Sequence, residues 1–318
     1  MGEKTYLVTG VAGLIGSHVA ERLVARGDAV VGLDNFNDYY DVRQKRENVA
    51  GLLDGPRFTL VEADLRDAAA MASLVAAEKP VAIAHLGAMA NVRYSIGRAP
   101  LYHDVNITGS LHLLEAAIAN GNPNFVFAST SSVYGKTERL PFIETDVCDR
   151  PLAPYPASKR AVELLGYSYH NLHGLDFTAL RFFSVYGPRA RPDMMPFMVT
   201  DRVARGETIK LFNAGDMQRD WTYVDDIVDG VVAALDRPMG YELVNIGRGE
   251  PVLMRDFVTI VEELVGKSAV LETPPAPASE PPITYADVTK ARDLLGHDPK
   301  VDVRTGLERL WDWYRARA

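Results

Sequence analysis

Short runs of apolar residues alternate along the chain with stretches in which apolar residues recur every three or four positions. The short runs have the length of buried strands and lie at 5–9, 29–33, 58–63, 81–86 and 177–182. Stretches at 17–26 and 157–172 repeat instead at helical spacing. Strands that alternate with helices in this way predict a mostly parallel sheet covered on both faces. We therefore expect a doubly wound α/β fold of the Rossmann type.

The alternation weakens beyond about residue 181. Pro188, Pro192 and Pro196 interrupt the chain there, and shorter elements follow. A helix expected at 224–235 and a strand expected at 242–246 return to the first pattern and are predicted to rejoin the sheet. The two expected domains are a dinucleotide-binding domain of residues 1–181 plus 224–246 and a smaller, discontinuous α/β substrate-binding domain of residues 182–223 plus 247–318.

Three glycines lie where the first strand turns into the first helix, which is the context of a dinucleotide-binding loop. Gly10 permits the tight turn, and Gly13 lets the backbone approach a pyrophosphate. Gly16 lets the helix close onto the strand. The first helical amides, at Leu14 and Ile15, are expected to face the phosphates. The rival interpretation is that these are ordinary turn glycines.

Residues at the ends of the next strands extend the expected cofactor site. A carboxylate at Asp34 would accept hydrogen bonds from an adenosine ribose and repel a 2′-phosphate, so NAD is favoured over NADP. Asp64 and Leu65 end the third strand, at a position where they could contact the edge of an adenine. The other residues expected at the cofactor beside strand ends are Asn35, Leu86 and Ala88.

Tyr155 and Lys159 stand four residues apart, 25 positions after Thr130. Residues four apart share one helix face, so the lysine ammonium can lie beneath the tyrosine hydroxyl and favour its phenolate. Because free tyrosine titrates near ~10, it needs such help to act as a base at neutral pH. The rival interpretation is that Tyr155 merely packs and that Lys159 is solvated.

Composition narrows the possible partners. The 34 Lys+Arg and 42 Asp+Glu give a net charge of −8 without a basic block, which argues against a nucleic-acid partner. Cys148 is the only cysteine, so no internal disulfide can form and a cytoplasmic location is expected. The early first strand leaves no room for a signal peptide, and no apolar run approaches membrane-spanning length. The seven histidines lack metal-binding spacing, so no metal is expected, and His18 and His85 are expected in the core.

Taken together, these motifs resemble those of the extended short-chain dehydrogenases/reductases, specifically the nucleotide-sugar epimerase branch. The matching segments are 9–16, 85–88, Asn106, 130–135, Tyr155 with Lys159, and 219–221. The resemblance implies NAD as cofactor, with Asn106 at the cofactor and Thr130, Tyr155 and Lys159 as the catalytic residues. It also implies that Tyr155, with its pKa lowered by Lys159 and the nicotinamide charge, takes the proton of a sugar hydroxyl.

The residue types at positions 131 and 132 distinguish the reactions that members of this branch catalyse. The related 4,6-dehydratases carry an Asp-Glu pair just after the catalytic threonine, and the UDP-glucuronate decarboxylases place a glutamate in this segment. Ser131 and Ser132 occupy the two positions here, so neither chemistry has its usual acid or base. Epimerisation at C4 through a transient 4-keto sugar is therefore expected.

The segments 33–41 and 181–194 are similar to signatures of the UDP-glucuronate 4-epimerases. This resemblance implies that Arg191 faces the sugar carboxylate and that Ser184 and Ser131 or Ser132 hydrogen-bond it. A guanidinium suits this task because it holds a carboxylate bidentately and in plane. The clamp would keep the carboxylate of the 4-keto sugar out of the alignment that leads to loss of CO₂. The rival interpretation is that Arg191 caps a loop or binds a partner acid.

The same resemblance implies that Arg219 binds the diphosphate of the nucleotide and that Arg93 contacts the substrate. The simplest rival role for Arg219 is a surface ion pair with Asp216 or Asp220. The Pro-rich stretch 273–282 is expected to form a loop that reaches the cleft. One departure is Asn91, which stands where the glucuronate group usually has glycine.

The predicted reaction is the conversion of UDP-glucuronate to UDP-galacturonate. Two alternatives stay open, a UDP-glucose/UDP-galactose 4-epimerase and a non-catalytic NAD-binding regulator. A homodimer is implied by the family, through helices expected at about 101–120 and 157–172. The apolar residues that could serve either this interface or an internal sheet are Tyr102, Leu111, Leu114 and Ile118.

Overall fold

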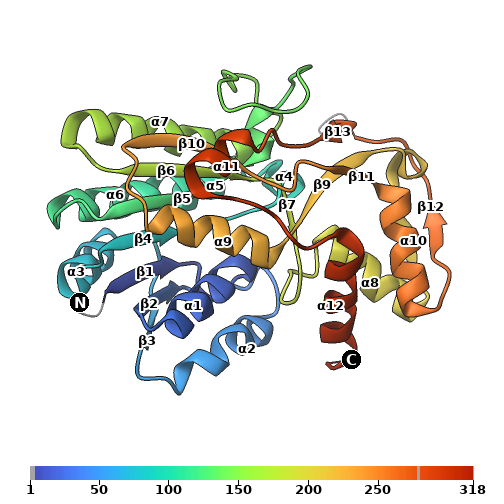
Figure 1. Cartoon of the computed structure of the whole chain (residues 1–318), viewed down its shortest axis with the longest axis horizontal. Helices are drawn as coiled ribbons and strands as arrows, with labels where there is room; N and C mark the ends of the chain where they lie inside the picture. Colours follow the sequence, from blue (N-terminus) through green and yellow to red (C-terminus); the bar gives the residue numbers. More distant parts are fainter. Residues whose placement is uncertain (1–3, 278–279, 318) are drawn as a thin grey trace.

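A seven-stranded parallel sheet forms one side of the molecule (Figure 1) in the order β10-β6-β5-β4-β1-β2-β3. The computed structural model describes residues 4–277 and 280–317. The strands are β1 (Thr5–Thr9), β2 (Ala29–Asp34), β3 (Phe58–Glu62), β4 (Ala82–His85), β5 (Asn124–Thr130), β6 (Phe177–Phe182) and β10 (Tyr241–Ile246). Every neighbouring pair in this sheet is parallel, which confirms the doubly wound α/β fold.

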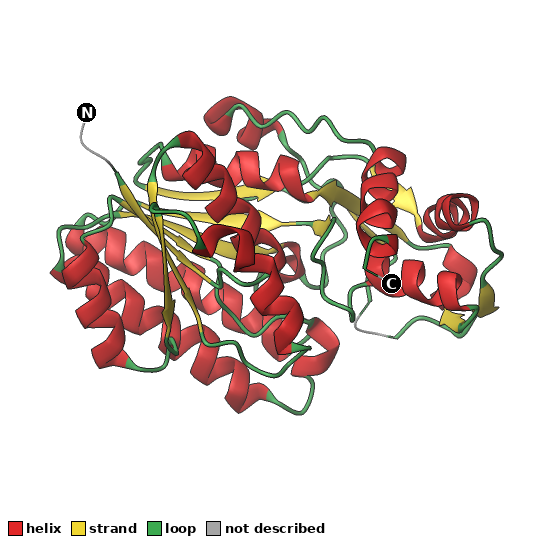
Figure 2. Cartoon of the chain, turned by 90° about the horizontal axis from the view of Figure 1, so that it is seen from below, coloured by secondary structure: helices red, strands yellow, loops and turns green. Residues whose placement is uncertain are grey.

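Helices cover both faces of the sheet (Figure 2). One layer comprises α1 (Leu14–Arg26), α2 (Val42–Leu53) and α9 (Val224–Leu235), and the other comprises α3 (Ala68–Glu78), α6 (Gly109–Ala119) and α7 (Pro154–His173). Successive strand residues point to opposite faces. Tyr6 and Val8 accordingly pack with the first layer and Leu7 with the second. Burial on both faces explains why the strands read as continuous apolar runs.

A continuous helical run covers the helix expected at about 101–120, but it contains a π-helical segment. It consists of α5 (Ala99–Tyr102), a π-helix (His103–Thr108) and α6, and the short helix α4 (Val92–Ser95) precedes it. Single π-helical turns are frequent at functional sites, where they reposition side chains. Tyr102 and Leu114 are fully buried inside the chain, so these two residues serve the internal core rather than an exposed stripe.

Most of the remaining elements gather beside the carboxyl ends of the sheet, with α8, α10 and α12 close together in Figure 1. The helices are α8 (Met195–Arg205), α10 (Met254–Val265), α11 (Thr289–Leu295) and α12 (Val303–Arg315). Their strands are β7 (Ser184–Tyr186), β8 (Thr208–Lys210), β9 (Gln218–Tyr223), β11 (Pro251–Leu253), β12 (Val270–Glu272) and β13 (Ile283–Thr284). Two 3₁₀ turns complete the chain at Ser131–Tyr134 and Phe212–Gly215. The division into two domains stays a prediction.

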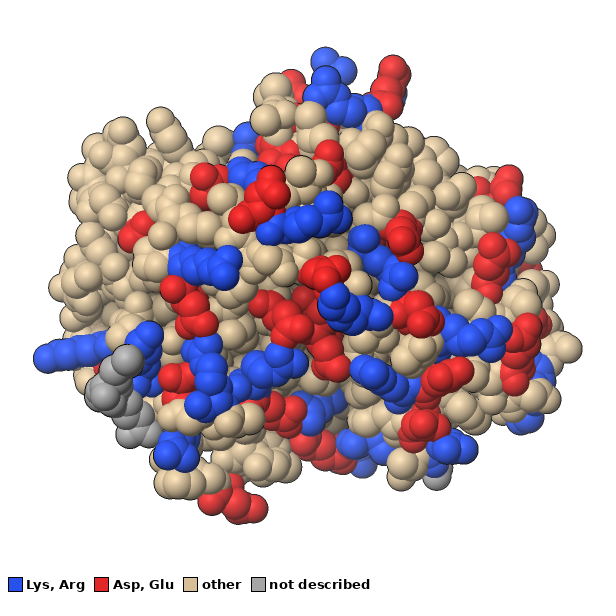
Figure 3. Space-filling model, in the orientation of Figure 1, with Lys and Arg blue, Asp and Glu red and all other residues tan. Residues whose placement is uncertain are grey.

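Residues 273–277 and 280–282 lie outside helices and strands, as the proline content predicts. Ala278 and Ser279 of the same expected loop lie outside the described residues. On the face drawn in Figure 3, Lys and Arg side chains are interspersed with Asp and Glu. Within residues 4–277 and 280–317, no helix is long and apolar enough to span a membrane, and no cluster of three His, Cys, Asp or Glu is arranged to hold a metal ion.

Candidate active site

A cavity of about 530 Å³ lies at the carboxyl ends of the parallel strands. Ligands of open α/β sheets bind at this edge, because loops from several strands converge there. The predicted site residues that line the cavity are Gly10, Gly13, Leu14, Ile15, Gly16, Asp34, Asn35, Asp64, Leu65, Leu86, Ala88, Arg93, Thr130, Tyr155, Lys159, Ser184 and Arg191. Asn106, Ser131, Ser132 and Arg219 were also predicted but are not part of its lining.

The glycine turn is too close-packed for any larger residue. Gly10 has a φ of +68°, and a Cβ there would lie 2.7 Å from the Cα of Gly87. A Cβ on Gly16 would lie 2.2 Å from the carbonyl oxygen of Gly10. No side chain of the described chain caps the N-terminus of α1 at Gly13. The first-turn amides are therefore available to phosphate oxygens at the positive end of the helix dipole.

Acidic and amide side chains continue the cavity beyond the glycine turn. The Asp34 carboxylate accepts hydrogen bonds from the backbone amides of Ala12 at 3.1 Å and Phe36 at 2.9 Å, which ties it to the glycine turn. The side chain of Asn35 donates to Asp64 at 2.9 Å. A carboxylate can accept hydrogen bonds from the hydroxyls of an adenosine ribose, and the amides of an uncapped helix N-terminus can donate to a pyrophosphate. The residues present therefore fit NAD.

Asn106 lies behind the cavity wall rather than in it. Its side chain accepts a hydrogen bond from the Met89 amide at 2.8 Å and donates to the Met89 carbonyl and to Ser158, both at 2.9 Å. These bonds join the π-helix to α7 and fix the backbone of Met89, which lines the cavity. Asn106 thus shapes the wall of the cavity through its neighbours.

Tyr155 lies in the first turn of α7. This helix begins at Pro154, three residues before the expected start at residue 157. Pro154 and Pro156 do not delay the helix, because the amides of a first turn have no intrahelical partner to lose. Burial raises the pKa of Tyr155, while the Thr130 side chain and the charge of Arg191 lower it. The pKa of Tyr155 is raised overall, with burial as the largest cause. The lowering expected from Lys159 together with the nicotinamide charge stays a prediction.

Lys159 is buried, with its ammonium 4.7 Å from the centre of the Phe127 ring. Burial lowers the pKa of Lys159 to about 7, and the charge of Glu163 opposes this change. Within the described ranges the ammonium has no hydrogen-bond or ion-pair partner, and the residue lines the cavity. A buried cation without a protein partner at a cavity wall is suited to contact a polar group of a ligand. The interpretation of Lys159 as a solvated surface residue is therefore wrong.

Arg191 lines the cavity and forms a two-bond ion pair with Asp193. Its Nε donates to one carboxylate oxygen at 2.9 Å and its Nη2 donates to the other at 3.2 Å. The second oxygen also accepts from the Tyr39 hydroxyl at 2.9 Å and from the Asn91 side chain at 2.6 Å. Four side chains from three loops thus form one polar cluster in the wall of the cavity.

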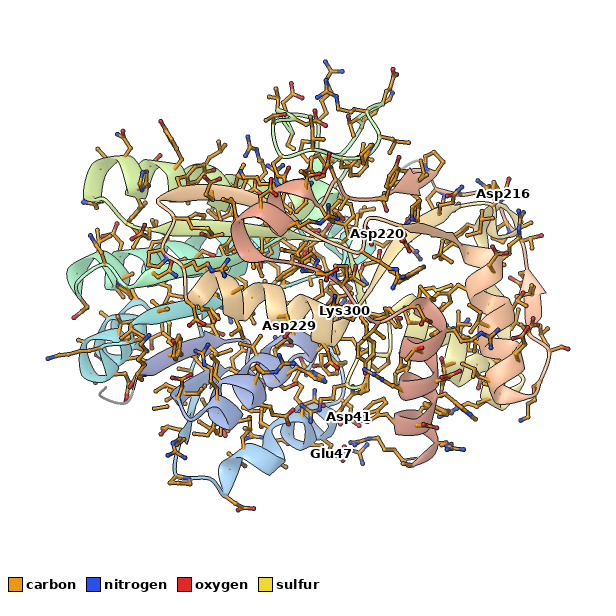
Figure 4. All side chains as sticks on the ribbon, in the orientation of Figure 1. Asp41, Glu47, Asp216, Asp220, Asp229 and Lys300 are labelled. Carbon is orange, nitrogen blue, oxygen red and sulfur yellow. The ribbon has the colours of Figure 1, made fainter. Side chains whose placement is uncertain are left out.

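Glu280, in the stretch after β12, joins two arginines that were predicted to contact the substrate. Its carboxylate accepts from Arg93 Nε and from Arg219 Nη2, both at 3.0 Å. The rival partners of Arg219 are engaged elsewhere, because Asp216 pairs with Arg255, and Asp220 accepts from backbone amides. Figure 4 shows Asp216 near the outer end of α10 and Asp220 nearer the centre of the molecule.

Only one of the three serines that were expected to hold a carboxylate lines the cavity. Ser184, the first residue of β7, lines it. Ser131 and Ser132 begin the 3₁₀ turn after β5, and the Ser132 amide donates to the Thr130 hydroxyl at 3.1 Å. This bond orients the Thr130 side chain at the end of β5.

Several cavity residues were not predicted from the sequence. They are Asn37, Tyr39, Tyr40, Lys45, Asp193 and Glu280. An acidic residue two positions after Arg191 was a usable signal for Asp193, because such spacing permits a local ion pair. No local signal indicated Glu280, since its partners lie 187 and 61 positions away.

A Rossmann-type sheet whose glycine turn and Tyr-x-x-x-Lys helix share one cavity defines a nucleotide-dependent epimerase or dehydratase. The model of the NAD dependent epimerase/dehydratase family matches residues 6–247, and the chain belongs to this family. The predicted resemblance is thereby confirmed.

Individual relatives narrow the comparison. The chain is 41% identical over 309 residues to the UDP-glucuronate 4-epimerase of Thermodesulfobacterium geofontis, an alignment that covers 97% of this chain and 95% of the relative. The crystal structure of UDP-glucuronic acid 4-epimerase from Bacillus cereus with UDP-glucuronic acid and NAD is 34% identical, with a TM-score of 0.92 and coverage of 98% and 99%. UDP-glucose 4-epimerase from Thermotoga maritima with UDP-glucose is 32% identical, with a TM-score of 0.89 and the same coverage.

Proposed function

We propose that this protein is an NAD-dependent 4-epimerase that interconverts UDP-glucuronate and UDP-galacturonate through a transient 4-keto sugar. The observation that carries the proposal is the presence of Arg191 in the same cavity as Thr130, Tyr155 and Lys159. A guanidinium beside a tyrosine base is suited to a sugar that carries a carboxylate next to its reacting carbon. The similarity to UDP-glucuronate 4-epimerases supports this substrate.

In the proposed reaction, the glycine turn holds the pyrophosphate of NAD and Asp34 holds its adenosine ribose. When bound, NAD supplies a hydride acceptor and donor for C4 of the sugar. Lys159, which lines the cavity, is proposed to contact the ribose next to the nicotinamide. Asn35, Asp64, Leu65, Leu86 and Ala88 enclose the rest of the cofactor.

Tyr155 is the proposed base. Its phenolate takes the proton of the 4-hydroxyl and returns a proton after the 4-keto sugar has rotated within the cavity. Thr130, at the end of β5, hydrogen-bonds the same hydroxyl and orients it. Arg93 and Arg219 are proposed to bind the diphosphate, and their shared contact with Glu280 supports this role because it shows that both reach one anionic group.

A neutral-sugar epimerase is the alternative, and the similarity to UDP-glucose 4-epimerase favours testing it. In an Arg191→Ala variant, we expect the KM for UDP-glucuronate to rise about tenfold to a hundredfold, because a charge-assisted interaction is lost. Turnover of UDP-glucose should fall less, because with a neutral sugar only the effect of the Arg191 charge on Tyr155 is lost. Arg189→Ala is the matched control, since Arg189 pairs with Glu21 and is not part of the cavity lining. Equal kinetics of Arg191→Ala and wild type on both sugars would refute the role of Arg191.

A homodimer and a cytoplasmic location are part of the proposal. Leu164, Tyr167 and Leu172 on α7 are 54%, 54% and 71% exposed, which supports an apolar helix face available to a second copy. Sedimentation velocity would test the dimer, and a single species of monomer mass would exclude it. The lone Cys148 suits a reducing compartment, and cell fractionation would test the location.

A further inference from the structure

Asp193 joins three loops that follow strands of two different sheets. Tyr39 follows β2 and Asn91 follows β4 in the seven-stranded sheet, whereas Arg191 and Asp193 follow β7, which pairs with β9. All three partners donate hydrogen bonds to the Asp193 carboxylate, and two of these bonds cross 154 and 102 positions of sequence. Although burial raises the pKa of Asp193, the bonds from Arg191, Asn91 and Tyr39 lower it overall, so the group is a carboxylate at neutral pH.

The ion pair leaves part of the guanidinium free. A guanidinium has five N–H donors, and Asp193 uses Nε and one proton of Nη2, which form one side of the group. The end formed by Nη1 and the other Nη2 proton has no partner among the described residues. This end can donate two hydrogen bonds to a second carboxylate while Asp193 remains bound. The Tyr39 ring lies 5.5 Å from the guanidinium carbon and restricts its movement.

Asn91 is held in an uncommon backbone conformation at this position. Its φ of +83° is in the region that favours glycine, yet its side chain is used twice. The Oδ1 atom accepts from the Tyr94 amide at 3.0 Å and caps α4, while Nδ2 donates to Asp193 at 2.6 Å. A residue other than glycine is retained in strained backbone where its side chain makes specific contacts.

We propose that Asp193, held by Asn91 and Tyr39, is a positioning residue that fixes the plane of Arg191 and thereby prevents decarboxylation of the 4-keto sugar. This inference rests on the proposed function. In this proposal Asp193 does not contact the reacting atoms. Its effect passes through Arg191, whose free end would hold the sugar carboxylate.

The chemistry at risk is that of a β-keto acid. In the 4-keto sugar the bond between C5 and the carboxylate carbon can break, its electron pair moves into the C4 carbonyl as an enolate, and CO₂ leaves. Addition of a proton at C5 then gives the UDP-4-keto-pentose. The hydride that was taken from C4 in the proposed reaction reduces this ketone to a UDP-pentose. The bond breaks only when it is aligned with the carbonyl π-system, so a fixed guanidinium plane that holds the carboxylate out of this alignment suppresses the reaction.

The same contacts would also fit an opposite role for Asp193, competition with the substrate for Arg191. If Asp193 only occupied Arg191 in competition with the substrate, its removal would free the guanidinium and tighten binding of UDP-glucuronate. The positioning role predicts the reverse, because an untethered arginine holds a carboxylate less well and in more orientations. The two roles therefore differ in the sign of the change in KM and in the products formed.

The test measures the ratio of UDP-pentose to UDP-galacturonate formed from UDP-glucuronate, by chromatography, together with KM. In Asp193→Asn, which keeps the shape but presents an amide to three donors, we expect the ratio to rise at least about fivefold and KM to rise about tenfold. Asn91→Gly and Tyr39→Phe each remove one donor and should raise the ratio by smaller factors. Glycine accepts the φ of residue 91 without strain. Asp216→Asn is the matched control, since it breaks an exposed pair with Arg255 outside the cavity.

The outcomes separate this inference from the proposed function. If wild type does not consume UDP-glucuronate, the proposed function fails and this inference fails with it. If wild type epimerises and all three variants keep the wild-type ratio, only this inference is overturned. A lower KM in Asp193→Asn without UDP-pentose would also overturn it, in favour of competition.

Discussion

Tyr155 is subject to opposing influences whose balance decides whether it can act as a base. Burial favours the neutral phenol, whereas Thr130 and Arg191 favour the phenolate. Each unit of pKa corresponds to about 1.4 kcal/mol between the two protonation states, so a few such contacts decide the outcome. Arg191 therefore has a second effect besides any contact with a carboxylate, because its positive charge acts on the base itself.

We expect Tyr155→Phe to lower kcat by about 10²- to 10⁴-fold, the range of a lost general base. NAD content and melting temperature should stay close to wild type, because only a hydroxyl is removed. Tyr241→Phe is a matched control, since its hydroxyl donates to the Glu163 carbonyl and Tyr241 does not line the cavity. Steady-state kinetics on UDP-glucuronate provide the measurement, and a Tyr155→Phe enzyme of full activity would show that Tyr155 is not the base.

Side chains differed in how far the sequence could predict their positions. Thr130, Tyr155 and Lys159 were predictable because strand ends and an i,i+4 spacing on one helix bring them to one cavity. The contact of Asp193 with Tyr39 and Asn91 was not, because loops from three strands must converge to form it. The direction of the pKa shift of Tyr155 also depends on burial, which local spacing does not report.

At the level of elements, a chain of hydrogen bonds connects β1, β4 and the π-helix beneath the cavity. The Gly87 amide donates to the Thr9 hydroxyl at 3.0 Å, and this hydroxyl lies 2.8 Å from His85 Nδ1. His85 Nε2 lies 2.8 Å from the Ser110 hydroxyl, which donates to the Asn106 carbonyl at 2.5 Å. These directions assign the proton of His85 to Nε2 and require a neutral ring. His85 is thus a core residue, as predicted.

This buried histidine predicts a loss of stability in acid. Burial, with a smaller effect from Lys159, lowers the pKa of His85 to about 3. An unfolded histidine titrates near ~6.5, so between these values the unfolded chain binds more protons and unfolding becomes easier as pH falls. Relative to His85→Gln, wild type should lose roughly 1 to 2 kcal/mol of unfolding free energy between pH 6.5 and 5. Urea titrations with saturating NAD would measure this, and parallel pH curves would contradict it.

The turn before α1 gives a second prediction at this level. Gly16→Ala should destabilise the protein by about 1 to 3 kcal/mol, because a Cβ would meet backbone that cannot move aside. Gly51→Ala, at an exposed site in α2 with open space around it, should stabilise by about 0.5 to 1 kcal/mol. Thermal unfolding would measure both changes, and a Gly16→Ala protein as stable as wild type would contradict the close approach at the turn.

The elements themselves were largely predictable. β1 and β6 match the expected ranges, and α9 begins and ends at the expected residues, because long apolar runs and repeats specify them. The helix expected at about 101–120 contains a π-helical segment, and α7 begins at Pro154 rather than at residue 157. Both differences arise from backbone details, a widened turn and a proline-rich first turn, that apolar periodicity does not encode.

Across the whole molecule, the cavity depends on segments from both parts of the chain. The glycine turn, Thr130 and Tyr155 come from the turn after β1, the end of β5 and the first turn of α7, while Arg191 and Glu280 come from segments beyond β6. Glu280 holds Arg93 of the first part and Arg219 of the second in one ion-pair network. In the proposed function a sugar nucleotide would lie in this cavity, with its reacting carbon at Tyr155 and its diphosphate at the two arginines.

The most direct test of this account is to incubate the purified protein with UDP-glucuronate and no added NAD, and to resolve the products by chromatography. We expect UDP-galacturonate as the main product, formed with cofactor that stays bound through purification, and UDP-pentose only as a trace product. A UDP-pentose as the main product would contradict the proposed role of Arg191. Turnover of UDP-glucose but not of UDP-glucuronate would contradict the central claim and assign the protein to the neutral-sugar epimerases.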